Sequence, residues 1–297
     1  MGKASGLCFS FLVESLTSRV RTLRENIDTV LNEEPDGIHD MRVASRRLRA
    51  ALSECAPLLP KGPRNELRRI ARRVTRLLGR ARELDVTLEM LAQFSAIHAD
   101  AREAAAALAR PLREERARLS PDCIEAAHLA ACEDLDALLV RLFEGAHPRA
   151  GRVLEIVSRR LKRRFEALFR CYEKWMETGD REQLHRVRVA FKKLRYACEL
   201  FAPFFDDNLH GCIQELRQLQ EHLGAWNDAR ALLREAAASV SGENGPPPGM
   251  DTVCLAFEEQ LRAHLQAFHT IASDFFSSRR RRQLRRLMSA AHLPPPE

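Results

Sequence analysis

The sequence lacks several features that mark whole classes of protein. Its 297 residues include only two tryptophans and two tyrosines, and its basic segments contain few aromatic residues, of which Phe191 and Tyr196 are the nearest. Aromatic platforms for stacking nucleic-acid bases are therefore scarce beside the basic residues. No apolar run approaches the roughly 20 residues that a membrane-spanning helix needs, and Glu14 interrupts the short apolar stretch behind the N-terminus. We therefore expect no signal peptide, no transmembrane helix and no membrane partner.

Cysteine pairs with metal-ligand spacing are also missing. The eight cysteines are scattered along the chain and form no CxxC motif, which argues against a zinc site and a thioredoxin-like site. Helical spacing places Cys55 on an apolar face with Met41, Ala44, Leu48 and Leu52, and Cys198 on another with Val187, Ala190, Leu194 and Phe201. We therefore expect reduced, buried thiols in a cytoplasmic protein. We predict no metal and no cofactor, and the sequence specifies no oligomeric state.

Positive charge is present in sectors. The chain carries 48 Lys and Arg against 41 Asp and Glu. Residues 42–82 contain 13 basic and two acidic residues, whereas residues 99–144 contain six basic and ten acidic ones. Most of the basic residues are arginine, whose planar fork matches phosphate oxygens. This pattern indicates an anionic, phosphate-bearing partner.

Composition and periodicity predict an all-α fold. Alanine, leucine, arginine and glutamate dominate, and no stretch alternates apolar and polar residues as a strand would. Turn residues predict breaks between helices. The breaks are expected near residues 35–37, 57–63, 120–122, 145–151, 178–180 and 241–249, and the last residues, from Leu293 to Glu297, are expected to form a frayed tail.

An internal repeat organises the chain. Residues 39–49 and 185–195 both read His-x-x-Arg-Val-Ala-x-basic-basic-Leu-Arg, at an offset of 146 residues. A second pair, 78–83 and 223–228, follows at an offset of 145 and shares Leu-Gly and a closing acidic residue. We infer a duplication, with a first helical half at 7–145, a second at 146–290 and a tail at 291–297.

Each copy of the repeat predicts a row of cations along one helix. At about 100° per residue, the histidine and three basic residues of each copy share an arc of about 80°. These residues are His39, Arg42, Arg46 and Arg49 in the first copy and His185, Arg188, Lys192 and Arg195 in the second, with Arg47 and Lys193 beside them. Nothing in either row offers a carboxylate, so the rows suit a polyanion; the alternative is a solvated basic face.

The helix after the first row extends the basic field. Opposite its apolar side we find Arg69, Arg72, Arg73, Arg76 and Arg80. The equivalent positions of the second half hold Gln214, Arg217, Gln218, Glu221 and Ala225, of which only Arg217 is basic. We therefore expect the first half to bind anions more strongly, unless these arginines serve only to keep the helix soluble.

The doubled motif resembles that of the CHAD domain (conserved histidine α-helical domain) family. The segments 78–86 and 219–228 strengthen the resemblance. It implies two helical-bundle halves related by a pseudo-twofold axis, with a basic central channel. It also implies binding of inorganic polyphosphate and association with polyphosphate granules, with the residues of both rows as ligands.

The chain departs from the family pattern in two respects. Glu83 stands where relatives tend to have Asp, and nothing here resembles the triphosphate-tunnel catalytic domain that precedes many relatives. We therefore expect a stand-alone binding module without catalytic residues. Cations beside His39 and His185 should lower the pKa of both histidines and a bound phosphate should raise it, so binding should tighten at mildly acidic pH.

Two other functions stay open at this point. The run Arg279–Arg286 is of the kind that attracts RNA or DNA, so nucleic acid is a candidate partner or competitor. A polyphosphate-processing enzyme would need carboxylates to hold Mg²⁺. Glu83, Asp85 and Asp228 could supply them, although pairing with arginines or helix capping is the simpler reading.

Overall fold

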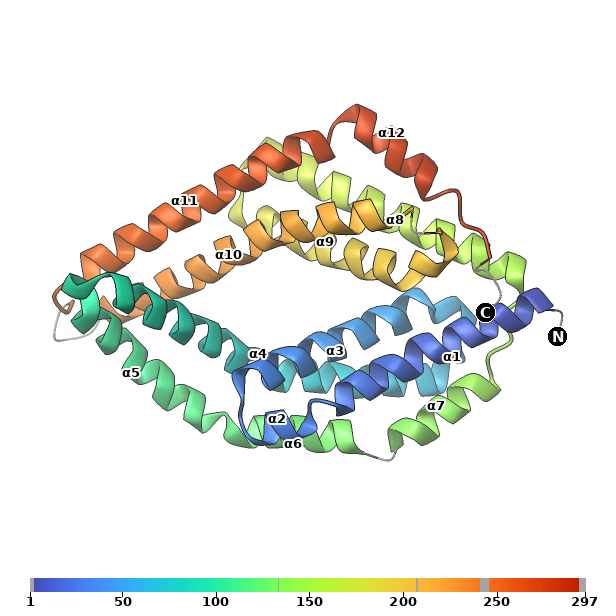
Figure 1. Cartoon of the computed structure of the whole chain (residues 1–297), viewed down its shortest axis with the longest axis horizontal. Coiled ribbons are helices and arrows are strands. Elements are labelled where there is room, and N and C mark those ends of the chain that lie inside the picture. The colour runs from blue at the N-terminus through green and yellow to red at the C-terminus, as the bar shows by residue number, and fades with distance from the viewer. Residues whose placement is uncertain (1–2, 133, 207, 241–245, 294–297) are drawn as a thin grey trace.

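The computed structural model describes residues 3–132, 134–206, 208–240 and 246–293, and within these ranges all regular structure is helical (Figure 1). The predicted all-α class is confirmed. The helices before residue 146 are α1 (Lys3–Arg24), α2 (Ile27–Leu31), α3 (Pro35–Glu54), α4 (Lys61–Ile97), α5 (Arg102–Arg118), α6 (Ser120–Ala131) and α7 (Asp134–Glu144), with 3₁₀ turns at Ala56–Leu58 and Ala99–Ala101. Those after it are α8 (Ala150–Thr178), α9 (Arg181–Phe201), α10 (His210–Val240), α11 (Met250–Phe275) and α12 (Ser278–Leu287), with a 3₁₀ turn at Ala202–Phe204.

Local chemistry sets the ends of the two helices that carry the repeat. α3 begins at Pro35, whose missing N–H and restricted φ suit a first helical position. The chain leaves α8 through Gly179, at a φ of 63°, and Asp180 then caps α9 by accepting a hydrogen bond from the Glu182 N–H at 3.1 Å. The predicted break at 178–180 is confirmed, and the break expected near residues 35–37 lies directly before them, at 32–34, so that Pro35 is the first residue of α3. Of the predicted loop 241–249, residues 241–245 lie outside the described ranges.

Gly37 lets α2 lie against the start of α3. A Cβ atom added at this position would be 2.9 Å from the Thr29 carbonyl carbon and closer still to the Thr29 side chain. Only glycine permits this approach, which places the first turn of α3 directly before His39.

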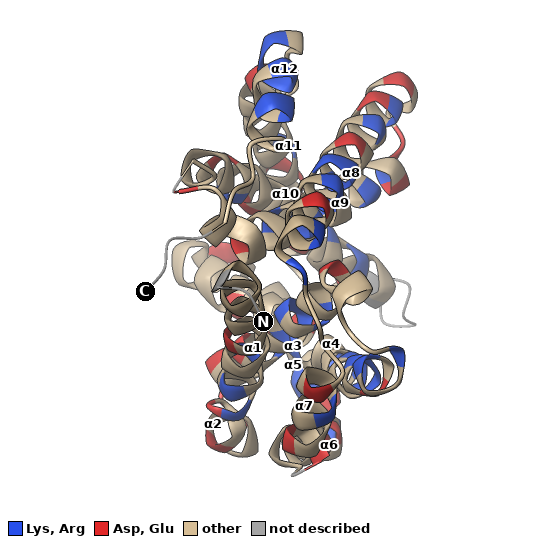
Figure 2. Ribbon diagram, turned by 90° about the vertical axis from the view of Figure 1, so that its right-hand side faces the viewer, with Lys and Arg blue, Asp and Glu red and all other residues tan. Residues whose placement is uncertain are grey.

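The repeat helices face each other in the middle of the molecule. The pair α3 and α4 contacts the pair α9 and α10 through α3 against α9 and α4 against α10 (Figure 1). Figure 2 shows α8 and α12 at one end of the molecule and α2 and α6 at the other. The predicted apolar faces are confirmed: Met41, Ala44, Leu48, Leu52 and Cys55 are buried on α3, and Val187, Ala190, Leu194, Cys198 and Phe201 are buried on α9.

The hydrophobic cores cross the predicted boundary between the halves. The largest cluster joins Leu12 and Leu52 to Leu161 and Phe191. A second cluster is shared by α4, α5, α10 and α11. Helices from one predicted half thus cover apolar faces of the other half. The division into separate halves and their pseudo-twofold relation stay predictions.

The described end of the chain packs against the body. The His292 N–H donates to the Phe204 carbonyl oxygen at 3.0 Å, and His292 Nε2 lies 2.9 Å from Asp206. Leu293, expected in a frayed tail, packs against the largest core cluster. The rest of that predicted tail, residues 294–297, lies outside the described ranges.

The cysteines in the described ranges are free thiols. Cys55 and Cys198 are completely buried, and burial raises the pKa of Cys55 to about 12. Both cysteines therefore act as small apolar side chains. Within the same ranges, no helix combines the length and the apolar character of a membrane span.

Candidate functional site: a basic cavity between the repeat helices

A cavity of about 620 Å³ lies where α3, α4, α9 and α10 face one another. We call it the central cavity. It is lined by His39, Arg42, Arg46, Gly79, Arg82, Glu83, Val86, Thr87, His185, Arg188, Val189, Lys192, Asn227, Asp228, Arg230, Ala231 and Arg234. Seven lysine or arginine side chains and two carboxylates are in this set, so the cavity is strongly basic.

The lining follows the sequence repeat. His39, Arg42 and Arg46 line the cavity together with their counterparts at an offset of 146, which are His185, Arg188 and Lys192. Residues in and just after the second repeated pair, 78–83 and 223–228, also line the cavity together, at an offset of 145. The matching residues are Arg82 with Asn227, Glu83 with Asp228, and Val86 with Ala231. The structure thus brings equivalent positions of the two copies to one cavity, although their offset alone gave no indication of distance.

Arg42 and Arg188 are half-buried, and each has one fully buried nitrogen without a partner among the described residues. In both side chains this nitrogen is Nε, which is inaccessible to solvent. Burial lowers the pKa of both guanidinium groups, and neighbouring Arg46 lowers it further. A buried polar atom without a partner destabilises the fold by about 1–3 kcal/mol and more when charged. These atoms are therefore primed to donate to an anion.

Lys192 shows the strongest effect of this environment. Burial lowers its pKa to about 6, and the charges of Arg188, Arg46 and Arg42 act in the same direction. Asp228 opposes them. Burial also lowers the pKa values of His39 and His185, each with help from nearby arginines. The predicted direction of the histidine shifts is therefore the one that the structure gives.

Aromatic rings support two of the cavity arginines. The Arg46 guanidinium lies 5.9 Å from the centre of the Tyr196 ring, and that of Arg230 lies 5.6 Å from the Trp226 ring. Such contacts hold a guanidinium in place without neutralising it. The two side chains are thus ordered and still available to an anion.

A second cavity of about 200 Å³ adjoins the first and shares Arg46, Val189 and Lys192 with it. The remaining residues of this second cavity are Arg49, Ala50, Ser53, Glu54, Arg68, Arg164, Lys193 and Tyr196. Nε of Arg49 is buried there without a partner among the described residues. Glu54 is only 2% exposed and accepts hydrogen bonds from Arg164 at 2.5 and 2.7 Å. The cationic field therefore continues past Lys192.

Three predicted binding residues converge instead on one carboxylate. Glu199 lies 3.8 Å from Arg47, 3.6 Å from Arg195 and 3.3 Å from Arg217. The expectation that no carboxylate neutralises the rows is wrong at this point. Glu199 stands one turn after Arg195 on α9, and it reaches Arg47 of α3 and Arg217 of α10 because these helices pack together.

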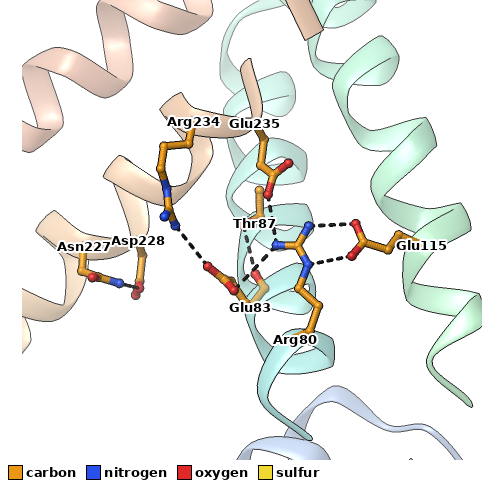
Figure 3. A network of polar contacts seen from close by, with 8 residues as sticks. All are labelled: Arg80, Glu83, Thr87, Glu115, Asn227, Asp228, Arg234 and Glu235. Atoms are coloured by element: carbon orange, nitrogen blue, oxygen red, sulfur yellow. Dashed lines mark hydrogen bonds and ion pairs between the residues drawn. The ribbon is translucent and has the colours of Figure 1, made fainter. Parts of the chain in front are cut away.

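The predicted arginines of α4 lie outside both cavities. Arg69, Arg72 and Arg76 are exposed, and Arg73 pairs with Glu125. Arg80 is held by Glu115 at 2.7 Å and Glu235 at 3.0 Å, with Glu83 at 3.6 Å (Figure 3). The side of α4 that meets the cavity carries instead Gly79, Arg82, Glu83 and Val86, which flank its apolar stripe. The predicted arginines of α4 therefore lie away from the cavities, and their part in anion binding stays a prediction.

Five basic residues of the two cavities were not among the predicted binding residues. They are Arg82, Arg230 and Arg234 in the central cavity and Arg68 and Arg164 in the second. The signal for three of them was present. Arg82 belongs to the second repeated pair, 78–83 and 223–228, where its counterpart is Asn227. Arg230 and Arg234 follow Asn227 by three and seven residues, a spacing that places them on the same face of a helix.

Glu83, Asp85 and Asp228, the carboxylates considered for a metal, each have a partner in the protein. Glu83 pairs with Arg234 at 3.3 Å, and Asp85 pairs with Arg116 at 2.8 Å (Figure 3 shows Glu83). Asp228 accepts a hydrogen bond from its neighbour Asn227 at 3.3 Å. Among the residues that the structure describes, no group of three or more histidines, cysteines or carboxylates could hold a metal ion.

We compared the sequence and the fold with those of known proteins. No curated protein matches the sequence. The fold is similar to the crystal structure of the CHAD domain from the plant Ricinus communis, with a TM-score of 0.60 and 19% identity over 97% of this chain and 93% of that one. It is similar also to PptA from Streptomyces chartreusis, with a TM-score of 0.63 and 18% identity over 89% of this chain and 99% of that one. The CHAD domain family model matches residues 14–237, and the chain therefore belongs to the CHAD domain family.

Proposed function

We propose that the central cavity binds inorganic polyphosphate and that the protein acts by binding, without catalysis. The observation that carries this proposal is that Arg42 of α3 and Arg188 of α9 line one cavity, and that each has a buried Nε atom without a hydrogen-bond partner among the described residues. An anion would supply the missing acceptors and offset the repulsion between like charges.

The shape and chemistry of the site favour a phosphate polymer over a nucleic acid. The lining of the central cavity contains no phenylalanine, tyrosine or tryptophan on which a base would stack. Because the two cavities share Arg46 and Lys192, a linear ligand could follow the cations from one into the other. Polyphosphate carries charge at every unit and has no bases to accommodate.

Binding without turnover agrees with the engagement of the nearby carboxylates. Phosphoryl transfer commonly depends on carboxylates that hold Mg²⁺. Glu83 faces the cavity already paired with Arg234, and the carboxylate of Asp85 is held by Arg116. We further propose that binding recruits the protein to polyphosphate granules in the cytoplasm.

The double variant Arg42→Gln/Arg188→Gln tests the site. It removes both guanidinium groups, so affinity for long-chain polyphosphate should fall by about a hundredfold or more, at about 1.5–3 kcal/mol for each charged hydrogen bond. Titration calorimetry at fixed salt measures the change. Arg110→Gln/Arg113→Gln removes equal charge from exposed positions of α5 and should bind as the wild type does.

Two controls distinguish this function from its alternatives. RNA at comparable phosphate concentration should fail to displace polyphosphate, and steady phosphate release in the presence of Mg²⁺ should not occur. Unchanged affinity of the double variant, with its circular-dichroism spectrum intact, would refute binding in the central cavity. Efficient displacement by RNA would favour the nucleic-acid reading.

A further inference from the structure

The terminal arginine run forms a helix with two different faces. On one face, Arg280 pairs with Glu215 at 2.5 Å, and Arg285 pairs with Glu166 at 2.5 Å. Arg281 on the same face lies 2.9 Å from Glu166 and 2.7 Å from Glu173, and its guanidinium lies over the Phe169 ring. These contacts with α8 and α10 fix α12 to the body of the protein.

The other face of α12 carries Arg279, Arg282 and Arg286, and we call it the α12 arginine face. All three side chains are exposed, and none has an ion pair or a side-chain hydrogen bond within the part of the chain that the structure describes. Their spacing of three and four residues places them in an arc of about 60° and spreads them over about 10 Å of helix. The face is a rigid row of three uncompensated cations.

This face is separate from the cavities. α12 lies beyond α8 and α11 at one edge of the molecule, whereas the central cavity lies between α3, α4, α9 and α10 (Figures 1 and 2). No residue of α12 lines the central or the second cavity. A ligand on the α12 arginine face would therefore leave the cavities open.

The chemistry of α12 selects among anionic partners. An interfacial membrane helix needs an exposed apolar face, but Leu284 is 1% exposed and Leu287 packs against the largest core cluster. Stacking of nucleic-acid bases needs aromatic side chains, and Ser278–Leu287 contains none. What remains is a closely spaced row of guanidinium forks, which suits the backbone of a phosphate polymer.

We propose that the α12 arginine face is a second binding surface for polyphosphate, independent of the central cavity. This inference rests on the proposed function of the cavity. A molecule with two separated sites can bind two chains, or two segments of one chain, and so cross-link long polymers. Short chains fill the cavity without joining molecules.

The test compares three variants of the full chain. The first, Arg279→Gln/Arg282→Gln/Arg286→Gln, removes the α12 arginine face. The second, Arg21→Gln/Arg110→Gln/Arg113→Gln, removes equal charge from exposed arginines elsewhere. The third is the cavity variant Arg42→Gln/Arg188→Gln. Light scattering with long-chain polyphosphate measures cross-linking, and calorimetry with tripolyphosphate measures the cavity.

The α12 variant should retain tripolyphosphate affinity within about twofold and lose cross-linking by long chains, with its affinity for long chains about tenfold weaker. The charge-matched variant should behave as the wild type. Equal cross-linking by the α12 and charge-matched variants would refute the proposal of a second polyphosphate surface. The proposal would also be refuted if the α12 variant lost binding to RNA or to phosphatidylserine vesicles but kept its cross-linking by polyphosphate. Unchanged tripolyphosphate binding by the cavity variant would instead refute the proposed function.

Discussion

Lys192 stands where the two cavities meet, among Arg42, Arg46 and Arg188, with Asp228 as the nearby carboxylate. Its pKa of about 6 means that the amine is largely neutral near pH 7.5 in the free protein. A bound polyanion favours the charged form and raises the pKa. Lys192, one of the three residues that both cavities share, therefore gains its charge together with the ligand.

Binding should consequently take up protons. Because the pKa of Lys192 is lowered in the free protein and raised in the complex, affinity should increase as the pH falls from 8 to 6 and should level off below the free-state pKa. His39 and His185, whose pKa values are also lowered, act in the same direction. Calorimetry in buffers of different ionisation enthalpy counts the protons taken up.

The substitution Lys192→Arg separates this effect from the histidines. Arginine keeps a cation at the junction but does not titrate in this range. Proton uptake should fall by up to one per site while strong binding persists. If Lys192→Arg and the wild type took up equal numbers of protons, the lysine would have no part in the pH dependence.

At the scale of the helix, α3 and α9 show how one element can serve stability and binding. Each buries its apolar face and turns its basic arc toward the partner helix. The basic arcs repel one another, so the packing of the apolar faces must hold them together. The contact between α2 and the start of α3 supports this arrangement at Gly37, directly before the basic row.

Gly37→Ala should destabilise the fold by about 1–3 kcal/mol, because the new methyl group would press on the Thr29 backbone. Denaturant unfolding measures the loss of stability, and polyphosphate affinity shows whether the loss reaches the binding site. Gly151→Ala is the matched control in α8, where an added Cβ meets nothing within 4 Å. It should be neutral or stabilising by up to about 1 kcal/mol, and equal effects of both substitutions would show that the α2 contact is unimportant.

At the scale of the whole molecule, the ligand and the fold stabilise each other. A polyanion that binds only the folded protein raises the free energy of unfolding. Long-chain polyphosphate should therefore raise the melting temperature at low salt, and the increase should shrink steeply as salt is added. Differential scanning calorimetry over a salt series measures it. Sulfate at equal ionic strength is the control, and an increase that persists at high salt would contradict an electrostatic mode of binding.

The periodicity of the sequence was sufficient to predict the helices, their apolar faces and the two cationic arcs. These features depend on residues three, four and seven positions apart, which a helix places on one face whatever the rest of the fold does. The repeat offset likewise identified His39, Arg42 and Arg46 with His185, Arg188 and Lys192. The α12 arginine face was not predictable in this way, because the sequence does not distinguish its three arginines from the other three arginines of α12.

Which cations stay free of a carboxylate depends on how the helices pack. Arg80 is held by carboxylates 35 and 155 residues away, and Arg47 meets Glu199 from another helix. Arg42 and Arg188 line the same cavity, and neither forms an ion pair with a carboxylate among the described residues. The physical reason is that charge compensation acts through space, over a few ångströms, between groups that the packing of the helices brings together.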